Sequence, residues 1–195
     1  MEQRMSDTKY MSATEAYKAA QRAVQYFAGE LGRNSTPTQL RRLADDMDML
    51  ADVFDRRPET WTAETFFDPH ARKVCSVGML YPKFRNKAKL KGLKLKKVTR
   101  RTDNKVSAHD DGLNSFLIEI NDARLSGRYD DVLFLGPKNA ARIYKVLAPA
   151  VRKLADLRAK GGPLKTEVVK ATLNGPLRAA ENKASWYSTH KKIAA

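Results

Sequence analysis

Two helix-start signals near the N-terminus constrain the fold of this chain more than any other feature. Ser12 is followed three residues later by Glu15, and Thr36 is followed three residues later by Gln39. In such a capping box the hydroxyl accepts a hydrogen bond from a backbone N–H of the first turn, and the Glu or Gln side chain accepts one from the capping residue's N–H. Pro37 fits the first helical position, where a missing N–H costs nothing. The sequence therefore predicts two helices that begin at these boxes.

Apolar residues after each box recur at the spacing of one helix face. Gly32, Asn34 and Ser35 can end the first helix, so only a short turn separates it from the second. The first helix carries Ala16, Tyr17, Ala20, Ala23, Val24, Phe27 and Leu31, and the second carries Leu40, Leu43, Met47, Leu50 and Phe54. We expect these residues to be core, and the second helix to pack antiparallel on the first.

A third helix is predicted in the apolar stretch that follows Asp68-Pro69 and ends at the Tyr81-Pro82 pair. Trp61, Phe66 and Phe67 lie just before it. Because these aromatic residues precede the basic part of the sequence instead of alternating with it, we expect them to cover the core and not to stack on bases.

The next stretch predicts a fourth helix, capped by Ser107 and ending at about Asn121. Residues 132–135 form an apolar run that suits either a buried helix or a buried strand. Gly136-Pro137 then opens a long helix, in which Pro149 can introduce a kink. These elements complete a predicted helical core that ends near residue 160.

The C-terminal part is expected to form a separate helical extension. Gly161-Gly162-Pro163 marks the boundary, residues 164–173 form one helix, and Asn174-Gly175-Pro176 breaks it before a terminal basic helix over residues 177–193. Trp186 and Tyr187 lie in that last helix. Two interpretations stay open: the helix contacts phosphates and stacks on bases, or it packs back on the core.

The net charge of +15 is concentrated in two segments. Residues 83–105, here called the basic segment, hold 11 Lys or Arg against one acid, and residues 138–195 hold 13 against three. Residues 1–82, in contrast, hold 11 bases against 12 acids. A surface that serves only solubility would intersperse both signs, whereas long runs of one sign are tolerated best beside a polyanion. The distribution therefore indicates a polyanionic partner.

Lysines in the basic segment alternate with Ala88 and with leucines on either side of Gly92. This period of two favours a β-hairpin-like or extended arm over a helix. A solvated loop without a partner is the alternative. The residues expected to contact phosphate are Lys83, Arg85, Lys87, Lys89, Lys91, Lys94, Lys96, Lys97, Arg100 and Arg101 here, with Lys138, Arg142, Arg152, Lys153, Arg178, Lys183, Lys191 and Lys192 in the second basic region.

Sequence motifs for catalysis, metals and cofactors are absent. There is no glycine-rich phosphate loop, Gly-x-Ser-x-Gly elbow or paired-histidine motif. Cys75 is the only cysteine, which excludes an intramolecular disulfide, and we expect its thiol to be buried. Asp45, Asp46, Asp48 and Asp52 flank a helical apolar stripe and are expected to face solvent without binding a metal. We therefore expect that the protein is not an enzyme. A nuclease site assembled from carboxylates that are distant in the sequence is the alternative.

The chain also lacks the apolar run of about 18 residues that a membrane helix needs, and residues 1–11 do not resemble a secretory signal. We therefore expect a cytoplasmic protein without membrane contacts.

Four short motifs lie between residues 61 and 147. They are Trp61, Val74-Cys75-Ser76-Val77-Gly78-Met79-Leu80, Ile120-Asn121-Asp122 and Gly127-Arg128-Tyr129-Asp130-Asp131-Val132-Leu133. Together they resemble a small helical domain family of unknown function from actinobacteria and their phages, with the basic segment as a departure from its pattern. The resemblance implies a helical core and a phage or bacterial source, and it carries no activity.

The sequence as a whole predicts a mainly α protein: a compact helical bundle over residues 1–160 with a basic arm, followed by a basic helical extension over 161–195. The predicted function is non-enzymatic, largely sequence-independent nucleic-acid binding, with duplex DNA favoured over RNA. One alternative is a protein-interaction module, such as a phage inhibitor or assembly factor, that docks on an acidic protein. Another is a structural component of a nucleoprotein particle.

Overall fold

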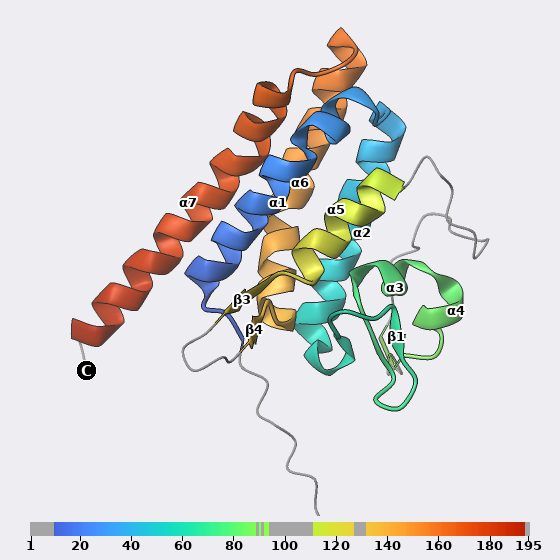
Figure 1. Ribbon diagram of the computed structural model, residues 1–195, viewed down its shortest axis with the longest axis vertical. Coiled ribbons are helices and arrows are strands. Elements are labelled where there is room, and N and C mark those ends of the chain that lie inside the picture. Colours follow the sequence, from blue (N-terminus) through green and yellow to red (C-terminus); the bar gives the residue numbers. More distant parts are fainter. Residues whose placement is uncertain (1–9, 89, 91, 94–110, 127–131, 194–195) are drawn as a thin grey trace, which may run out of the picture.

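The computed structural model describes residues 10–88, 90, 92–93, 111–126 and 132–193, and the fold is mainly helical (Figure 1). The larger helices are α1 (Ala13–Arg33), α2 (Pro37–Arg56), α5 (Asp111–Asn121), α6 (Pro137–Gly161) and α7 (Thr166–Ile193). The smaller elements are η1 (Pro58–Thr60), α3 (Ser76–Leu80) and α4 (Pro82–Arg85), with the strands β1 (Phe67–Asp68), β2 (Lys73–Val74), β3 (Arg124–Ser126) and β4 (Val132–Phe134). The predicted compact helical bundle is confirmed.

Both predicted capping boxes are formed. The Ser12 hydroxyl accepts from the Glu15 N–H at 3.3 Å, and the Glu15 carboxylate accepts from the Ser12 N–H at 2.8 Å. Thr36 and Gln39 repeat the arrangement at 3.2 and 2.8 Å. Helices α1 and α2 therefore begin where the sequence places them.

The partner of α2 differs from the prediction. Helix α2 packs chiefly on α6, while α1 packs chiefly on α7, so the two N-terminal helices do not pair with each other as expected. Helix α6 contacts α1, α2 and α7, and its Tyr144, Leu147 and Leu154 are fully buried. The short turn after α1 brings α2 near, but α2 buries its apolar face on α6 and α1 buries much of its own on α7.

The third predicted helix begins later than expected. Residues 67–74 form a small antiparallel hairpin of β1 and β2 instead of a first helical turn. The Asp68 carboxylate accepts from the N–H groups of His70 at 2.9 Å and Ala71 at 3.0 Å, and Arg72 has a left-handed φ of 55°. The acid thus closes a turn and does not cap a helix. The helix itself, α3, starts at Ser76.

The other predictions for the middle of the chain have mixed outcomes. The fourth helix ends at Asn121 as expected, while its predicted cap at Ser107 lies outside the described residues. Residues 132–134 form β4, which pairs with β3, and within the run 132–135 only Leu135 is fully buried. Trp61 is buried as expected, whereas Phe66 is 48% exposed and so is not a core residue.

Helix α7 runs without interruption through the predicted break at residues 174–176. Leu173 and Leu177, on either side of the break, are both fully buried. Burying such a side chain contributes about 1.5–3 kcal/mol, which across the helix offsets the roughly 3 kcal/mol cost of an interior proline. Figure 1 shows α7 lying along α1 over most of the height of the bundle.

Candidate nucleic-acid interface

The described part of the basic segment is its root, on and just after α4. Lys83 is exposed, and its ammonium lies 4.7 Å from the centre of the Phe84 ring. Lys87 is also exposed, and its carbonyl accepts from the Arg72 guanidinium at 2.8 Å. The predicted phosphate contacts further along, at Lys89, Lys91, Lys94, Lys96, Lys97, Arg100 and Arg101, lie outside the described residues, as does the predicted hairpin or arm.

Arg85 points toward the interior and not outward with its neighbours. It is half-buried, and its guanidinium lies 3.5 Å from the Met79 carbonyl. Burial lowers the pKa of Arg85, while the negative charge of Asp46 opposes that shift. Asp46 is only 3% exposed, so the expectation that it faces solvent is wrong. A buried carboxylate is costly without an opposite charge nearby, and the positive charge of Arg85 acts on Asp46 in this way.

The cations of α6 face the acids of α2. The Arg152 guanidinium bonds to Asp45 at 2.7 Å and to Asp48 at 2.5 Å, and these bonds raise the pKa of Arg152. A surface hollow of about 430 Å³ lies between α2 and α6. Its lining includes Asp48, Asp52 and Asp55 of α2 opposite Arg142 and Lys145 of α6. Arg152 is therefore neutralised within the protein, and Arg142 and Lys145 face carboxylates across the hollow.

Helix α6 carries two more of the residues that are predicted to contact phosphate. Both of them, Lys138 in the first turn and Lys153 beside Arg152, are exposed.

The cations of α7 have different surroundings. Arg178 and Lys183 are exposed, and among the described residues neither has an acidic side chain within ion-pair distance. Glu181, which lies between them, turns toward α1, where Gln21 donates to it at 2.6 Å and the Lys18 ammonium lies 3.9 Å away. Lys191 and Lys192 lie in the last turn of α7. This helix therefore presents unneutralised positive charge on its outer side.

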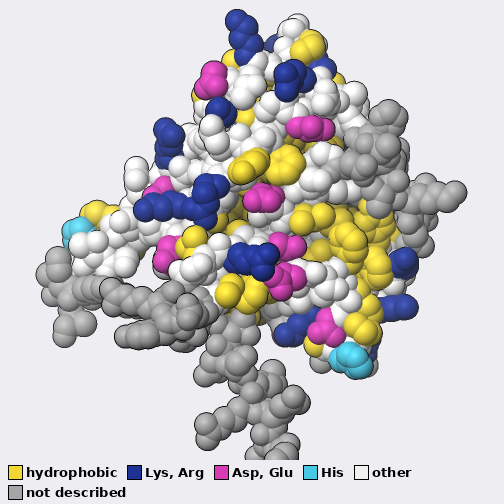
Figure 2. Space-filling view, in the orientation of Figure 1, with side chains coloured by type: hydrophobic (Ala, Val, Ile, Leu, Met, Phe, Trp, Pro, Cys, Tyr) yellow, Lys and Arg dark blue, Asp and Glu magenta, His cyan; other side chains and the backbone are white. Residues whose placement is uncertain are grey.

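The structure does not gather the described basic residues into one patch. Figure 1 shows α4 and the C-terminal part of α7 on opposite flanks of the bundle. The face between them carries positive and negative side chains side by side (Figure 2). A single long polyanion would have to reach around the bundle to contact both flanks, so the described basic residues form two separate groups.

Trp61, Ser76 and Asn121, which lie in three of the short motifs between residues 61 and 147, meet Tyr144 in a buried hydrogen-bond network. The Asn121 side-chain oxygen accepts from Trp61 Nε1 at 2.8 Å and from the Ser76 hydroxyl at 2.7 Å, and that hydroxyl lies 2.6 Å from the Tyr144 hydroxyl. The Asn121 amide donates to the Thr62 carbonyl at 3.1 Å. Because its groups satisfy one another, this network specifies the packing of the core.

Ionisable groups beside the network are held neutral. Burial raises the pKa of the Cys75 thiol to about 11, and burial also raises the pKa of Tyr144. The thiol accepts from the Gly78 N–H at 3.2 Å. Cys75 is therefore the buried small side chain that the sequence predicts, and a thiol held neutral makes a poor nucleophile.

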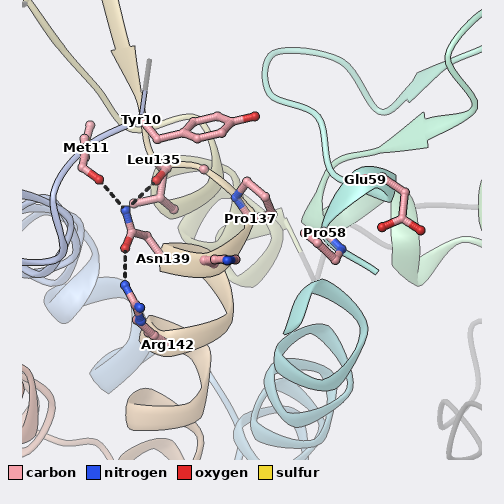
Figure 3. A pocket seen from close by; sticks show the side chains of 10 residues that line it. Tyr10, Met11, Pro58, Glu59, Leu135, Pro137, Asn139 and Arg142 are labelled. Carbon is pink, nitrogen blue, oxygen red and sulfur yellow. Dashed lines mark hydrogen bonds between the residues drawn. The ribbon is translucent and has the colours of Figure 1, made fainter. Parts of the chain in front are cut away.

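A cavity of about 520 Å³ opens where α6 begins (Figure 3). Tyr10, Met11 and Pro58 are among the residues that line it. The Asn139 amide donates to the carbonyls of Met11 at 2.7 Å and Leu135 at 2.9 Å, and its oxygen accepts from Arg142 at 3.2 Å. The central polar side chain of this cavity is thus already engaged, so the cavity offers a ligand mainly apolar contacts.

One feature of α7 was missed in the sequence. His190 stacks on Trp186 with ring centres 4.1 Å apart and planes at 25°, and both residues are exposed. Their spacing of four residues on a helix was the available signal, because side chains four apart lie on one face.

Within the described part of the chain, no three His, Cys, Asp or Glu side chains are grouped as metal ligands, and no helix is long and apolar enough to cross a membrane. Comparisons with family models, with curated proteins and with solved structures found no match to this chain.

Proposed function

We propose that this protein binds nucleic acid, largely independently of sequence, through the basic segment and the outer side of α7. We expect it to act without catalysis, in the cytoplasm, with duplex DNA as a principal partner. Phosphate contacts by Lys and Arg supply nearly all of the affinity in binding of this kind, and they need exposed cations that no nearby acid neutralises.

The observation that carries the proposal is the contrast between neutralised and unneutralised cations. Asp45 and Asp48 of α2 pair with Arg152 of α6, and Glu181 of α7 turns toward α1. Arg178 and Lys183 are left on the outer side of α7 without an acidic neighbour among the described residues. The basic segment adds 11 bases against one acid. A polyanion is the partner that relieves such a charge excess.

A protein partner with an acidic surface is the second candidate. Phe66 is 48% exposed at the root of the basic segment and stacks on Phe84 with ring centres 6.3 Å apart. Exposed aromatic residues beside cations also occur at protein interfaces.

A salt titration separates these functions. We would measure the affinity for a random duplex of about 30 base pairs, using the native chain and a variant with Gln at Lys87, Lys89, Lys91, Lys94 and Lys96. If these lysines contact phosphate, the slope of log affinity against log salt becomes shallower by roughly 4 to 5, at about 0.9 per contact.

A control variant should lose the same charge elsewhere. Gln at Lys18, Arg22, Arg33, Arg41 and Lys145 removes five exposed cations from α1, α2 and α6. We expect its slope to change by less than about 2, because long-range charge alone acts weakly at physiological salt. If the native protein has no measurable duplex affinity at low salt, the proposal fails and the acidic protein partner takes its place.

A further inference from the structure

The last turns of α7 extend beyond the helix that supports them. The buried side of α7 consists of Val169, Leu173 and Leu177, continued by the partly buried Ala180 and Ala184. From Ser185 to His190 every residue is exposed. Figure 1 shows this end of α7 at the edge of the molecule. These residues therefore do not pack in the core, although they continue the same helix.

This end of the helix holds an aromatic cluster, Trp186, Tyr187 and His190. Trp186 is 56% exposed and Tyr187 is 57% exposed. His190 stacks on the indole at 4.1 Å between ring centres, and His190 Nδ1 lies 2.8 Å from the Trp186 carbonyl oxygen. The Tyr187 ring meets the indole edge-on at 5.1 Å. These contacts orient the indole while more than half of the residue stays in contact with solvent.

The charge around the cluster is positive. No acid follows Glu181 in the sequence, whereas Lys183, Lys191 and Lys192 do. Glu181 itself is directed toward Lys18 and Gln21 of α1. Lys183 lies one helical turn before Trp186 and is exposed. The surroundings of the rings therefore favour a negatively charged ligand.

The remaining neighbours are polar, which bears on the kind of ligand. Asn182, Ser185, Ser188 and Thr189 are the other exposed residues of these turns. If Trp186 were part of a protein–protein interface, we would expect further exposed apolar side chains around it, because interface cores are depleted of charge and rich in apolar area. Flat rings among cations and small polar groups suit a base that stacks and a phosphate that pairs with lysine.

We propose that the aromatic cluster at the end of α7 stacks on unpaired nucleobases, with Lys183 contacting the adjoining phosphate. This inference rests on the proposed nucleic-acid binding and extends it to a second mode of contact. Bases inside a duplex are stacked on one another and expose only their edges, so the cluster binds single-stranded or locally open nucleic acid. Stacking of this kind tolerates any sequence, since every base has a flat face.

Tryptophan fluorescence tests the stacking directly. Trp61 is 5% exposed and is held by Asn121, so it serves as an unchanging reference, while Trp186 is the indole that a base can reach. We expect an oligothymidylate of about 15 nucleotides to quench the native protein. A duplex of the same length should quench it far less. Trp186→Phe should abolish the quenching while keeping most of the single-strand affinity, because the phenyl ring still stacks.

Affinity measurements with matched variants complete the test. Trp186→Ala should weaken binding of the oligothymidylate by roughly 5- to 150-fold, the range for loss of one stacked base, and change duplex binding by less than about twofold. Tyr26→Ala is the control, because Tyr26 is an aromatic residue of α1 that is 83% exposed. It should change neither affinity. Both positions are exposed, so we expect each variant to have the same melting temperature as the native protein.

The outcomes separate the two proposals. Absence of affinity for both single strand and duplex would overturn nucleic-acid binding and the stacking site together. Two other outcomes would overturn the stacking site alone, provided that the native protein binds both single strand and duplex. In the first, Trp186→Ala binds the single strand as tightly as Tyr26→Ala does. In the second, Trp186→Ala weakens the affinity for single strand and for duplex by the same factor. Self-association that Trp186→Ala abolishes would also overturn it, because a second copy of the chain would then cover the rings.

Discussion

Helices α6 and α7 are both long and net positive, yet their cations have different surroundings. Each contains an interior proline, Pro149 in α6 and Pro176 in α7. Arg152 of α6 bonds to Asp45 and Asp48 of its neighbour α2, while Arg178 and Lys183 of α7 face solvent. The comparison teaches that the neighbouring helix, and not the helix itself, decides whether a lysine or arginine is free to meet a ligand.

The two helices also differ in how they are buried. Helix α6 contacts three other long helices, whereas α7 contacts α1 and α6 from the edge of the bundle. Leu147 of α6 and Leu177 of α7 are both fully buried, so the same substitution can be made in both surroundings.

The largest expected effect is on stability. Leu147→Ala should lower the free energy of unfolding by about 4–5 kcal/mol, and Leu177→Ala by about 2–3 kcal/mol, within the range for such cavities. The difference arises because α7 can settle onto the cavity from the edge, whereas α6 is held on several sides. Urea unfolding monitored by circular dichroism measures both. Equal losses would show that α7 is as tightly built into the bundle as α6.

Reactivity of the single thiol provides a second comparison. Because burial raises the pKa of Cys75 to about 11, the thiol is protonated at pH 8 and should react slowly with a disulfide reagent in the native protein. Leu147→Ala should raise the labelling rate by roughly a thousandfold, since each 1.4 kcal/mol of its lost stability of about 4–5 kcal/mol increases opening tenfold. Leu177→Ala should raise it less.

The labelling rate of the Leu177→Ala variant also tests the predicted division of the chain at residue 161. If Leu177→Ala exposes Cys75 as much as Leu147→Ala does, α7 opens only together with the whole bundle. If it leaves the native labelling rate unchanged while helicity is lost, α7 detaches by itself.

Local signals in the sequence were sufficient where they agreed with the packing. The boxes at Ser12 and Thr36 and the apolar stripes after them gave the starts and buried faces of α1 and α2, because capping is decided within four residues. The same kind of signal failed at Asp68, whose carboxylate caps a turn. Asp and Pro suit the start of a turn as well as that of a helix, so composition could not choose between them.

Tertiary packing decided the remaining differences. Asn174-Gly175-Pro176 is a strong local signal for a break, yet burial of Leu173 and Leu177 keeps α7 continuous. The pairing of α2 with α6, and with it the neutralisation of Arg152, depends on which helices meet. That information is non-local, so the charge pattern predicted which segments are basic but not which cations remain free.

The next prediction tests the contrast in charge through binding. Replacing Arg178 and Lys183 of α7 by Gln should make the salt dependence of duplex binding shallower by about 2, at about 0.9 per phosphate contact. Replacing Arg142 and Arg152 of α6 by Gln should change it by less than about 1, because those cations face α2 carboxylates. Both variants lose two charges, so each is the control for the other. Equal changes would mean that the acids of α2 do not mask α6.

The smallest expected effect comes from removing the acids themselves. Asp45→Asn with Asp48→Asn should lower the free energy of unfolding by no more than about 1 kcal/mol, because exposed ion pairs contribute little. The same change should free Arg152 and steepen the salt dependence of duplex binding by up to about 1. Adding Arg152→Gln to this variant should cancel the gain. A steepening that persists without Arg152 would mean that the α2 carboxylates act by long-range repulsion of phosphate, and the difference between α6 and α7 would then lie in net charge instead of in pairing.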